Sequence, residues 1–114
     1  MAQGKSLSPE DLIAVSGEFF TISTRGNSTK VQLDQVERVE IFKIDEVTTD
    51  LICVEIWLAG GAEQRPILVH EDVPGFAALM ELFGTLPGFQ TDWFSRVSQP
   101  PFSECRLKAF ERRA

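Results

Sequence analysis

Residues 51–58, LICVEIWL, constrain the fold more than any other stretch of the chain. Apolar side chains occupy both phases of a period-two pattern, with Ile52, Val54 and Ile56 in one phase and Leu51, Cys53 and Trp57 in the other. Successive side chains of a strand point to opposite faces of a sheet. The pattern therefore predicts a strand whose two faces both need cover, which the rest of the chain or a partner must supply.

A hairpin is predicted directly after this strand. Gly60-Gly61 fits a two-residue hairpin turn. Pairing outward from that turn places Val54 opposite Ile67 and Ile52 opposite Val69. The apolar face of one strand then continues on the other, so the sequence pattern and the turn agree.

A main helix is predicted over residues 73–85. Asp72 can cap it, and Pro74 is tolerated in the first turn, where a missing N–H costs nothing. The apolar residues follow helical spacing: Val73, Phe76, Leu79, Met80 and Phe83. We expect this stripe to pack on the strand face that contains Ile52 and to form the central core with Ile52, Val54, Ile56, Ile67 and Val69.

The first half of the chain predicts a short helix followed by strands. Ser8 to Asp11 has the chemistry of a helix start, and Gly17 is a plausible stop. Strands are expected near 18–24, 30–33 and 36–44. In the last of these the apolar phase slips near Ile41 and Phe42, which suggests a bulge or a long bent strand, and a helix is the competing interpretation.

Residues 86–102, LPGFQTDWFSRVSQPPF, are rich in aromatic residues and proline. Leu86 to Phe89 fits a type II turn, with proline and glycine at its central positions. A single helical turn can run from Thr91 or Asp92 through Val97, and the prolines at 100 and 101 end it. Residues 105–110 alternate as a strand would, although they also contain good helix formers.

The second half resembles a loose group of small uncharacterised bacterial proteins. The likeness rests on the pattern LPGF…W…V…PPF, formed by Leu86, Pro87, Gly88, Phe89, Trp93, Val97, Pro100, Pro101 and Phe102. In that group the final segment is a strand, so the resemblance implies a strand near 105–110. The group has no function that can be transferred.

Together these elements predict a single α+β domain spanning residues 1–114. We expect a small antiparallel meander of about five to six strands, with one main helix packed on one face. The architecture is similar to that of pleckstrin-homology-like domains, by analogy only.

The aromatic segment can either seal the core or form a binding groove. The chain has nine Phe and no Tyr, which favours burial, because binding surfaces prefer aromatic rings with a polar tip. If the segment is a groove, Trp93, Phe94 and Phe102 are its candidate binding residues. Trp57 and Glu55, on the second face of the central strand, form another candidate surface.

A Cys–His pair is the one candidate for catalysis. In the predicted register Cys53 lies opposite Leu68, so His70 is its diagonal neighbour on the same face. Glu55, Glu71 or Asp72 could orient the imidazole. No cysteine-protease signature surrounds Cys53, and a thiol in the middle of an apolar strand is usually buried and inert.

No metal or cofactor site is predicted. One His and two Cys far apart in sequence do not form a zinc pattern, and the acidic residues lack EF-hand spacing. Gly60-Gly61 is not a dinucleotide fingerprint, because no helix is expected to follow it.

The chain is acidic, with a net charge of −6 over 114 residues. Residues 34–55 contain seven acidic residues against two basic ones, whereas residues 96–114 contain five basic residues against two acidic ones. Such a surface repels nucleic acid and anionic membranes and attracts a basic partner. No secretory signal or membrane span is recognisable, and two cysteines are too few for a disulfide framework, so a cytoplasmic location is expected. The resemblance to bacterial proteins implies a bacterial source.

Three functional hypotheses follow. The first is a non-catalytic interaction protein that neutralises a basic protein partner, as an immunity protein does. The second is a module that binds a small apolar ligand or a lipid between helix and sheet. The third is a small hydrolase that uses Cys53 and His70. A homodimer is also expected, because the face with Leu51 and Trp57 needs cover.

Overall fold

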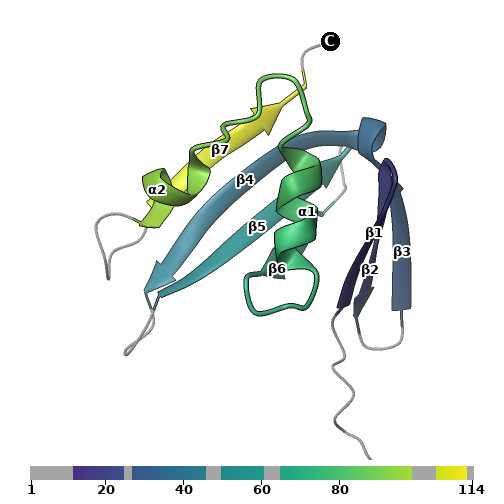
Figure 1. The fold of residues 1–114 in the computed structure, drawn as a ribbon, viewed down its shortest axis with the longest axis horizontal. Helices are drawn as coiled ribbons and strands as arrows, with labels where there is room; N and C mark the ends of the chain where they lie inside the picture. Colours follow the sequence, from purple (N-terminus) through teal and green to yellow (C-terminus); the bar gives the residue numbers. More distant parts are fainter. Residues whose placement is uncertain (1–11, 25–26, 46–49, 61–64, 99–104, 113–114) are drawn as a thin grey trace, which may run out of the picture.

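The computed structural model of the chain describes residues 12–24, 27–45, 50–60, 65–98 and 105–112, which form two antiparallel sheets and two short helices (Figure 1). The strands are β1 (Leu12–Ser16), β2 (Phe19–Thr24), β3 (Asn27–Gln32), β4 (Val36–Asp45), β5 (Asp50–Leu58), β6 (Ile67–His70) and β7 (Cys105–Glu111). The helices are α1 (Phe76–Phe83) and α2 (Trp93–Ser98), and a 3-10 turn (Leu33–Gln35) joins β3 to β4. The predicted antiparallel, sheet-rich fold is confirmed. The single meander with one main helix is not what forms.

A three-stranded sheet, in the order β1-β2-β3, forms the first part of the described chain. β1 occupies residues for which the sequence predicted a helix, and that prediction is wrong from Leu12 onward. Ser16 pairs with Phe19, so Gly17 belongs to a two-residue hairpin turn and has a φ of +63°. Ile13 is buried in the core. Cross-strand pairing therefore outweighs the helix-start chemistry of Ser8 to Asp11, which lies outside the described residues.

The second sheet has the order β6-β5-β4-β7. The pair β4–β5 lies at its centre, with β6 beside β5 and β7 beside β4. β4 is a strand throughout, which excludes the competing helix. Its irregularity against β5 lies between Val36 and Arg38, not at Ile41 and Phe42 as predicted. The slip in the apolar pattern has another cause, because Lys43 takes the inward position that follows Ile41 and is only 2% exposed.

The register of β5 against β6 differs from the prediction by two residues. Val54 pairs with Val69 and Ile56 with Ile67, so Gly60-Gly61 is not a two-residue hairpin turn. A shift of two residues keeps every side chain on its predicted face, because the side-chain period of a strand is two. The same shift places His70 directly opposite Cys53 rather than diagonal to it.

The helix α1 begins at Phe76, later than predicted, and its N-cap is Gly75 rather than Asp72. Gly75 has a φ of +95°, and a Cβ added there would lie 2.0 Å from the carbonyl oxygen of Ile13 in β1. The backbone N–H of Ile13 donates to the carbonyl of Pro74 at 2.9 Å. The start of α1 and the strand β1 are thus in direct backbone contact, which only glycine permits at this position.

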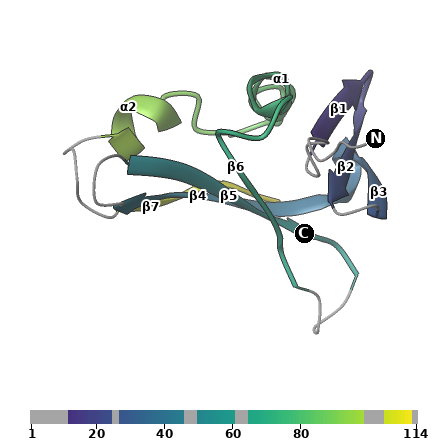
Figure 2. The same ribbon diagram turned by 90° about the horizontal axis from the view of Figure 1, so that it is seen from below.

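Both helices lie on one face of the four-stranded sheet, and the three-stranded sheet stands at its end beside α1 (Figure 2). We call this helix-covered face the inner face and the opposite one the outer face. Phe20 of β2 meets Phe83 of α1 edge-on, with 5.6 Å between ring centroids. A single buried cluster therefore extends from the three-stranded sheet through α1 to the inner face. The predicted core residues belong to it, with Ile67 partly buried at its margin.

Residues 86–98 and 105–111 match the sequence prediction closely. Gly88 has a φ of +81°, and the N–H of Phe89 donates to the carbonyl of Leu86, as a type II turn requires. The helical turn expected near 92–97 is α2, and residues 105–111 form the strand β7. Neither α1 nor α2, the helices of the described residues, has the length and apolar content needed to cross a bilayer.

Replacing Gly75 with alanine tests the contact between α1 and β1. We expect Gly75→Ala to lower the free energy of unfolding by more than about 3 kcal/mol, because the new Cβ collides with the Ile13 carbonyl as well as straining φ. Gly17→Ala is the matched control. Its φ is also positive but no atom lies within 4 Å of the added Cβ, so it should cost only about 1–2 kcal/mol. Equal losses in urea melts would contradict this packing.

Candidate functional site

A groove of about 450 Å³ opens on the helical side of the molecule, between α1 and the first turn of α2. Its lining combines core residues with exposed ones: Ile52, Glu71, Phe76, Ala77, Met80, Glu81, Trp93 and Phe94. Phe76 and Met80 are buried, so the floor of the groove is the surface of the core itself. Phe94 at its side is 56% exposed, which is a large exposed fraction for an apolar ring.

Three rings line this groove, with Trp93 nearly perpendicular to each of the other two. We call them the aromatic corner: Phe76, Trp93 and Phe94. The ring of Trp93 meets that of Phe76 at 80°, with 6.4 Å between centroids. It meets the ring of Phe94 at 84°, with a centroid distance of 5.7 Å. Aromatic rings prefer such edge-to-face pairs over face-to-face stacks. The rings therefore form an angled surface at this end of the groove rather than a flat one.

The charged side chains that line the groove are both carboxylates. Oε1 of Glu71 accepts the backbone N–H of Ile52 at 2.8 Å, and the N–H of Glu71 donates to the Ile52 carbonyl at 3.0 Å. These two bonds hold the Glu71 carboxylate at the edge of β5. Glu81, one helical turn beyond Ala77 on α1, is exposed. Across the described residues its carboxylate forms neither a hydrogen bond nor an ion pair. The groove is therefore apolar inside and negative at its rim.

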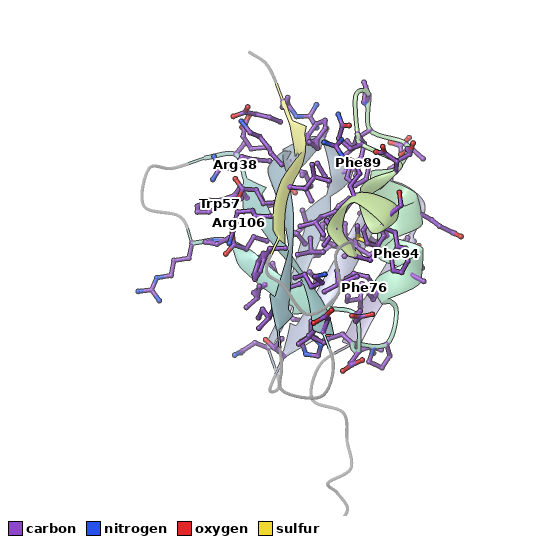
Figure 3. The ribbon with its side chains drawn as sticks, turned by 90° about the vertical axis from the view of Figure 1, so that its left-hand side faces the viewer. Arg38, Trp57, Phe76, Phe89, Phe94 and Arg106 are labelled. Carbon is purple, nitrogen blue, oxygen red and sulfur yellow. The ribbon has the colours of Figure 1, made fainter. Side chains whose placement is uncertain are left out.

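The outer face of the four-stranded sheet is built differently, and Figure 3 shows Arg38, Trp57 and Arg106 on the opposite side of the sheet from Phe76 and Phe94. Arg106 of β7 donates to Glu40 at 2.6 Å and to Glu55 at 3.1 Å. The hydrogen bonds that Arg106 donates to Glu40 and then to Glu55 raise the pKa of Arg106 above its ordinary value.

The arginines of this ion-pair network also cover the aromatic rings of the outer face. The guanidinium of Arg38 lies 4.4 Å from the centre of the Trp57 ring, and that of Arg106 lies 4.4 Å from the centre of the Phe42 ring. Arg38 also pairs with Glu40 at 3.1 Å. Two predicted binding residues, Trp57 and Glu55, are thus engaged by side chains of their own sheet.

The Cys53–His70 pair lies on the outer face as directly opposed residues of β5 and β6. The thiol is only 3% exposed. Nδ1 of His70 accepts the backbone N–H of Asp72 at 3.2 Å. Glu55 is bound to Arg106, and Glu71 is bound to the Ile52 N–H. Two of the three candidate orienting carboxylates, Glu55 and Glu71, therefore have other partners, which weighs against a nucleophile–base–orienter set.

A second hollow, of about 590 Å³, lies between the 87–90 turn and the edge strand β7. Its charged side chains already have partners. Lys108 pairs with Glu111 at 2.9 Å, and Arg112 donates to the carbonyls of Val36 and Leu33. The charged side chains of this hollow are therefore less available to a ligand than those of the groove.

The structure thus brings together two of the five predicted binding residues, Trp93 and Phe94, and places Glu55 and Trp57 on the far side of the sheet. Phe102 lies outside the described residues. Sequence reasoning missed Glu71 and Glu81 as site residues. The helical pattern could have indicated that Glu81 lies beside the buried Met80 and Phe83, but it could not indicate that α2 faces it across the groove.

Residues 86–98 turn out to serve both proposed roles. Phe89 and Val97 are buried in the core, whereas Trp93 and Phe94 line the groove. Across the described residues there is no cluster of three or more His, Cys, Asp or Glu side chains that could hold a metal ion. Comparisons with known protein families, with curated proteins and with solved structures found no match for this chain.

The burial of Cys53 predicts that its thiol is unreactive in the folded protein. In a Cys105→Ser background, so that Cys53 is the one thiol, modification by a thiol reagent at pH 7 should be slower by orders of magnitude than in urea. His70→Ala should leave the slow native rate unchanged. Rapid labelling of the folded protein that depends on His70 would instead support the hydrolase hypothesis.

Proposed function

We propose that this protein is a non-catalytic binding protein that receives a basic segment of a protein partner in the groove between α1 and α2. The observation that supports this most is the composition of the groove. Its floor is apolar, its exposed wall is Phe94, and its charged side chains, Glu71 and Glu81, are both acidic. A segment with apolar anchors and flanking cations complements such a surface.

The size of the groove supports binding of side-chain anchors rather than of a whole helix. A volume of about 450 Å³ accommodates a few side chains, and buried anchors of this kind supply most of the energy of protein interfaces. The net charge of −6 adds long-range attraction, which steers a basic partner toward the acidic protein. Binding through these features should weaken as salt screens the charges.

A bacterial cytoplasmic protein that neutralises a basic partner, in the manner of an immunity protein, is the biological form that we propose. Such a protein needs no catalytic set, only a surface that occupies the partner's basic region. The acidic stretch 34–55 places further negative charge on β4 and β5. This charge would oppose nucleic acid and anionic membranes as competing partners.

A small apolar ligand is the second candidate occupant, because the groove volume lies within the range of ligand pockets. The rim carboxylates disfavour a fatty acid or a phospholipid, since a like charge would lie beside its head group. A neutral or cationic ligand is compatible with the same chemistry.

We also propose that the outer face forms a homodimer contact. Ile44 is 38% exposed and Leu68 is 56% exposed on this face, on either side of the arginine–glutamate network. The network contains both signs of charge, so a two-fold copy could pair each arginine with a glutamate of its partner.

Binding of a defined peptide tests the proposed groove. An amphipathic helical peptide of leucine and lysine should bind the wild-type protein in calorimetry, and the matching leucine–glutamate peptide should not. Phe94→Ala should weaken the affinity about fivefold to thirtyfold, as loss of an interface anchor does. Glu81→Gln should weaken it about twofold to fivefold, as loss of an exposed charge pair does.

The matched control is Leu68→Ala. Leu68 has the same exposed fraction as Phe94 but lies on the outer face, so its loss should leave the affinity unchanged. Equal weakening by Phe94→Ala and Leu68→Ala would mean that the peptide adheres to any apolar surface, and the groove proposal would fail.

The homodimer is tested by sedimentation of the wild-type protein and of Trp57→Glu. We expect a wild-type dimer and a folded, soluble Trp57→Glu monomer, because a carboxylate at the centre of the outer face opposes a two-fold copy. A single wild-type monomer at high micromolar concentration would exclude the dimer.

A further inference from the structure

Several aromatic rings outside the groove are paired with a cation of the same chain. Four rings each carry a cation from the same chain, at centroid distances of 4.1 to 5.4 Å. The pairs are Lys30 on Phe19, Arg38 on Trp57, Arg106 on Phe42 and Arg112 on Phe110. Within the described residues, the three rings of the aromatic corner carry no such cation. The rings of Phe20, Phe83 and Phe89 carry none either, but they are buried, as Phe76 is, whereas Phe94 is 56% exposed.

The geometry of the aromatic corner suits a compact cation. Trp93 provides the strongest cation–π surface among side chains, and its ring is nearly perpendicular to those of Phe76 and Phe94. Rings that meet at right angles surround a compact ammonium group on more than one side. A planar guanidinium stacks best on one flat ring face, and each arginine of the outer face lies over a single ring.

The carboxylates of the groove provide the charge that such a cation needs. Oε1 of Glu71 is held by the Ile52 N–H, which fixes the direction of the carboxylate. Glu81 lies on the same α1 face as Ala77 and lines the same groove. The buried side chain of Met80 forms apolar floor, against which the methylene stem of a long cationic side chain can pack.

We propose that the aromatic corner, together with Glu71 and Glu81, is a subsite for one lysine side chain of the basic partner. The ammonium group lies against the rings of Trp93 and Phe94, and the carboxylates at the rim balance its charge. This assignment rests on the proposed function and adds the chemical identity of the anchor. It also explains why the groove rings have no cation of their own, since the partner supplies it.

Peptides with a single cation test this subsite. Three peptides of leucine, glutamine and alanine differ at one central position, which holds lysine, arginine or norleucine. Norleucine keeps the apolar stem and lacks the charge. We expect the lysine peptide to bind tightest, and Trp93→Leu and Phe94→Leu each to weaken it about threefold to thirtyfold. Neither variant should change the affinity of the norleucine peptide by a comparable factor.

Nuclear magnetic resonance supplies an internal control, because the chain has two tryptophans. The indole N–H resonance of Trp93 should shift on addition of the lysine peptide, and that of Trp57, whose ring already carries Arg38, should not. Phe94→Leu guards against misfolding, since the Phe94 ring is largely outside the core. Its amide spectrum should match that of the wild-type protein away from the groove.

Several results would overturn the subsite. Equal affinity for the norleucine and lysine peptides would show that the positive charge does not contribute to binding at the aromatic corner. Tighter binding of the arginine peptide would assign the corner to a guanidinium instead. If the leucine–lysine peptide binds and depends on Glu81 but not on either ring, the proposed function stands and the lysine subsite fails. If that peptide does not bind at all while free choline shifts Trp93, the corner is a small-cation site and the proposed protein partner is wrong.

Discussion

The need to cover both faces of β5 determines the rest of this structure. The inner face is covered in the ordinary way, by α1 and α2 with an apolar interface. Neither helix of the described residues lies over the outer face (Figure 2), and the sheet covers itself there with its own side chains. Arg38 lies over the Trp57 ring and pairs with Glu40. Arg106 lies over the Phe42 ring and pairs with Glu40 and Glu55. A thin layer of paired charges thus replaces a second layer of secondary structure.

This difference between the faces decides where a binding site can form. On the outer face, cations and rings satisfy one another within the chain, so a partner must displace existing contacts before it gains new ones. On the inner face the helices are short, and α2 covers the sheet only beyond the end of α1. Lys43, buried beneath α2, donates to the carbonyl of Ser98 at 3.2 Å and so ties the end of α2 to the sheet. The gap between the two helices is the groove.

The sequence predicted those parts of the fold that depend on local pattern. The alternation in β5, the apolar stripe of α1, the turn at Gly88 and the helical turn of α2 each follow from nearby residues. It failed where a distant contact decides the outcome. β1 is a strand because β2 pairs with it, and Gly75 caps α1 because the Ile13 carbonyl lies where a side chain would be. Lys43 took a core position that no pattern of apolar residues could indicate.

The candidate site was predictable in part for the same reason. Trp93 and Phe94 were candidates because they lie in the aromatic segment 86–102, although its lack of Tyr favoured burial over a groove. Their partners Glu71 and Glu81 belong to other segments and looked like ordinary solvated acids. What marks them in the folded protein is the comparison with the outer face. There each carboxylate near a ring has an arginine of the same chain beside it. In the groove the rings and the carboxylates are present and no cation of the described residues lies over the rings, which is the arrangement expected where a partner completes the interaction.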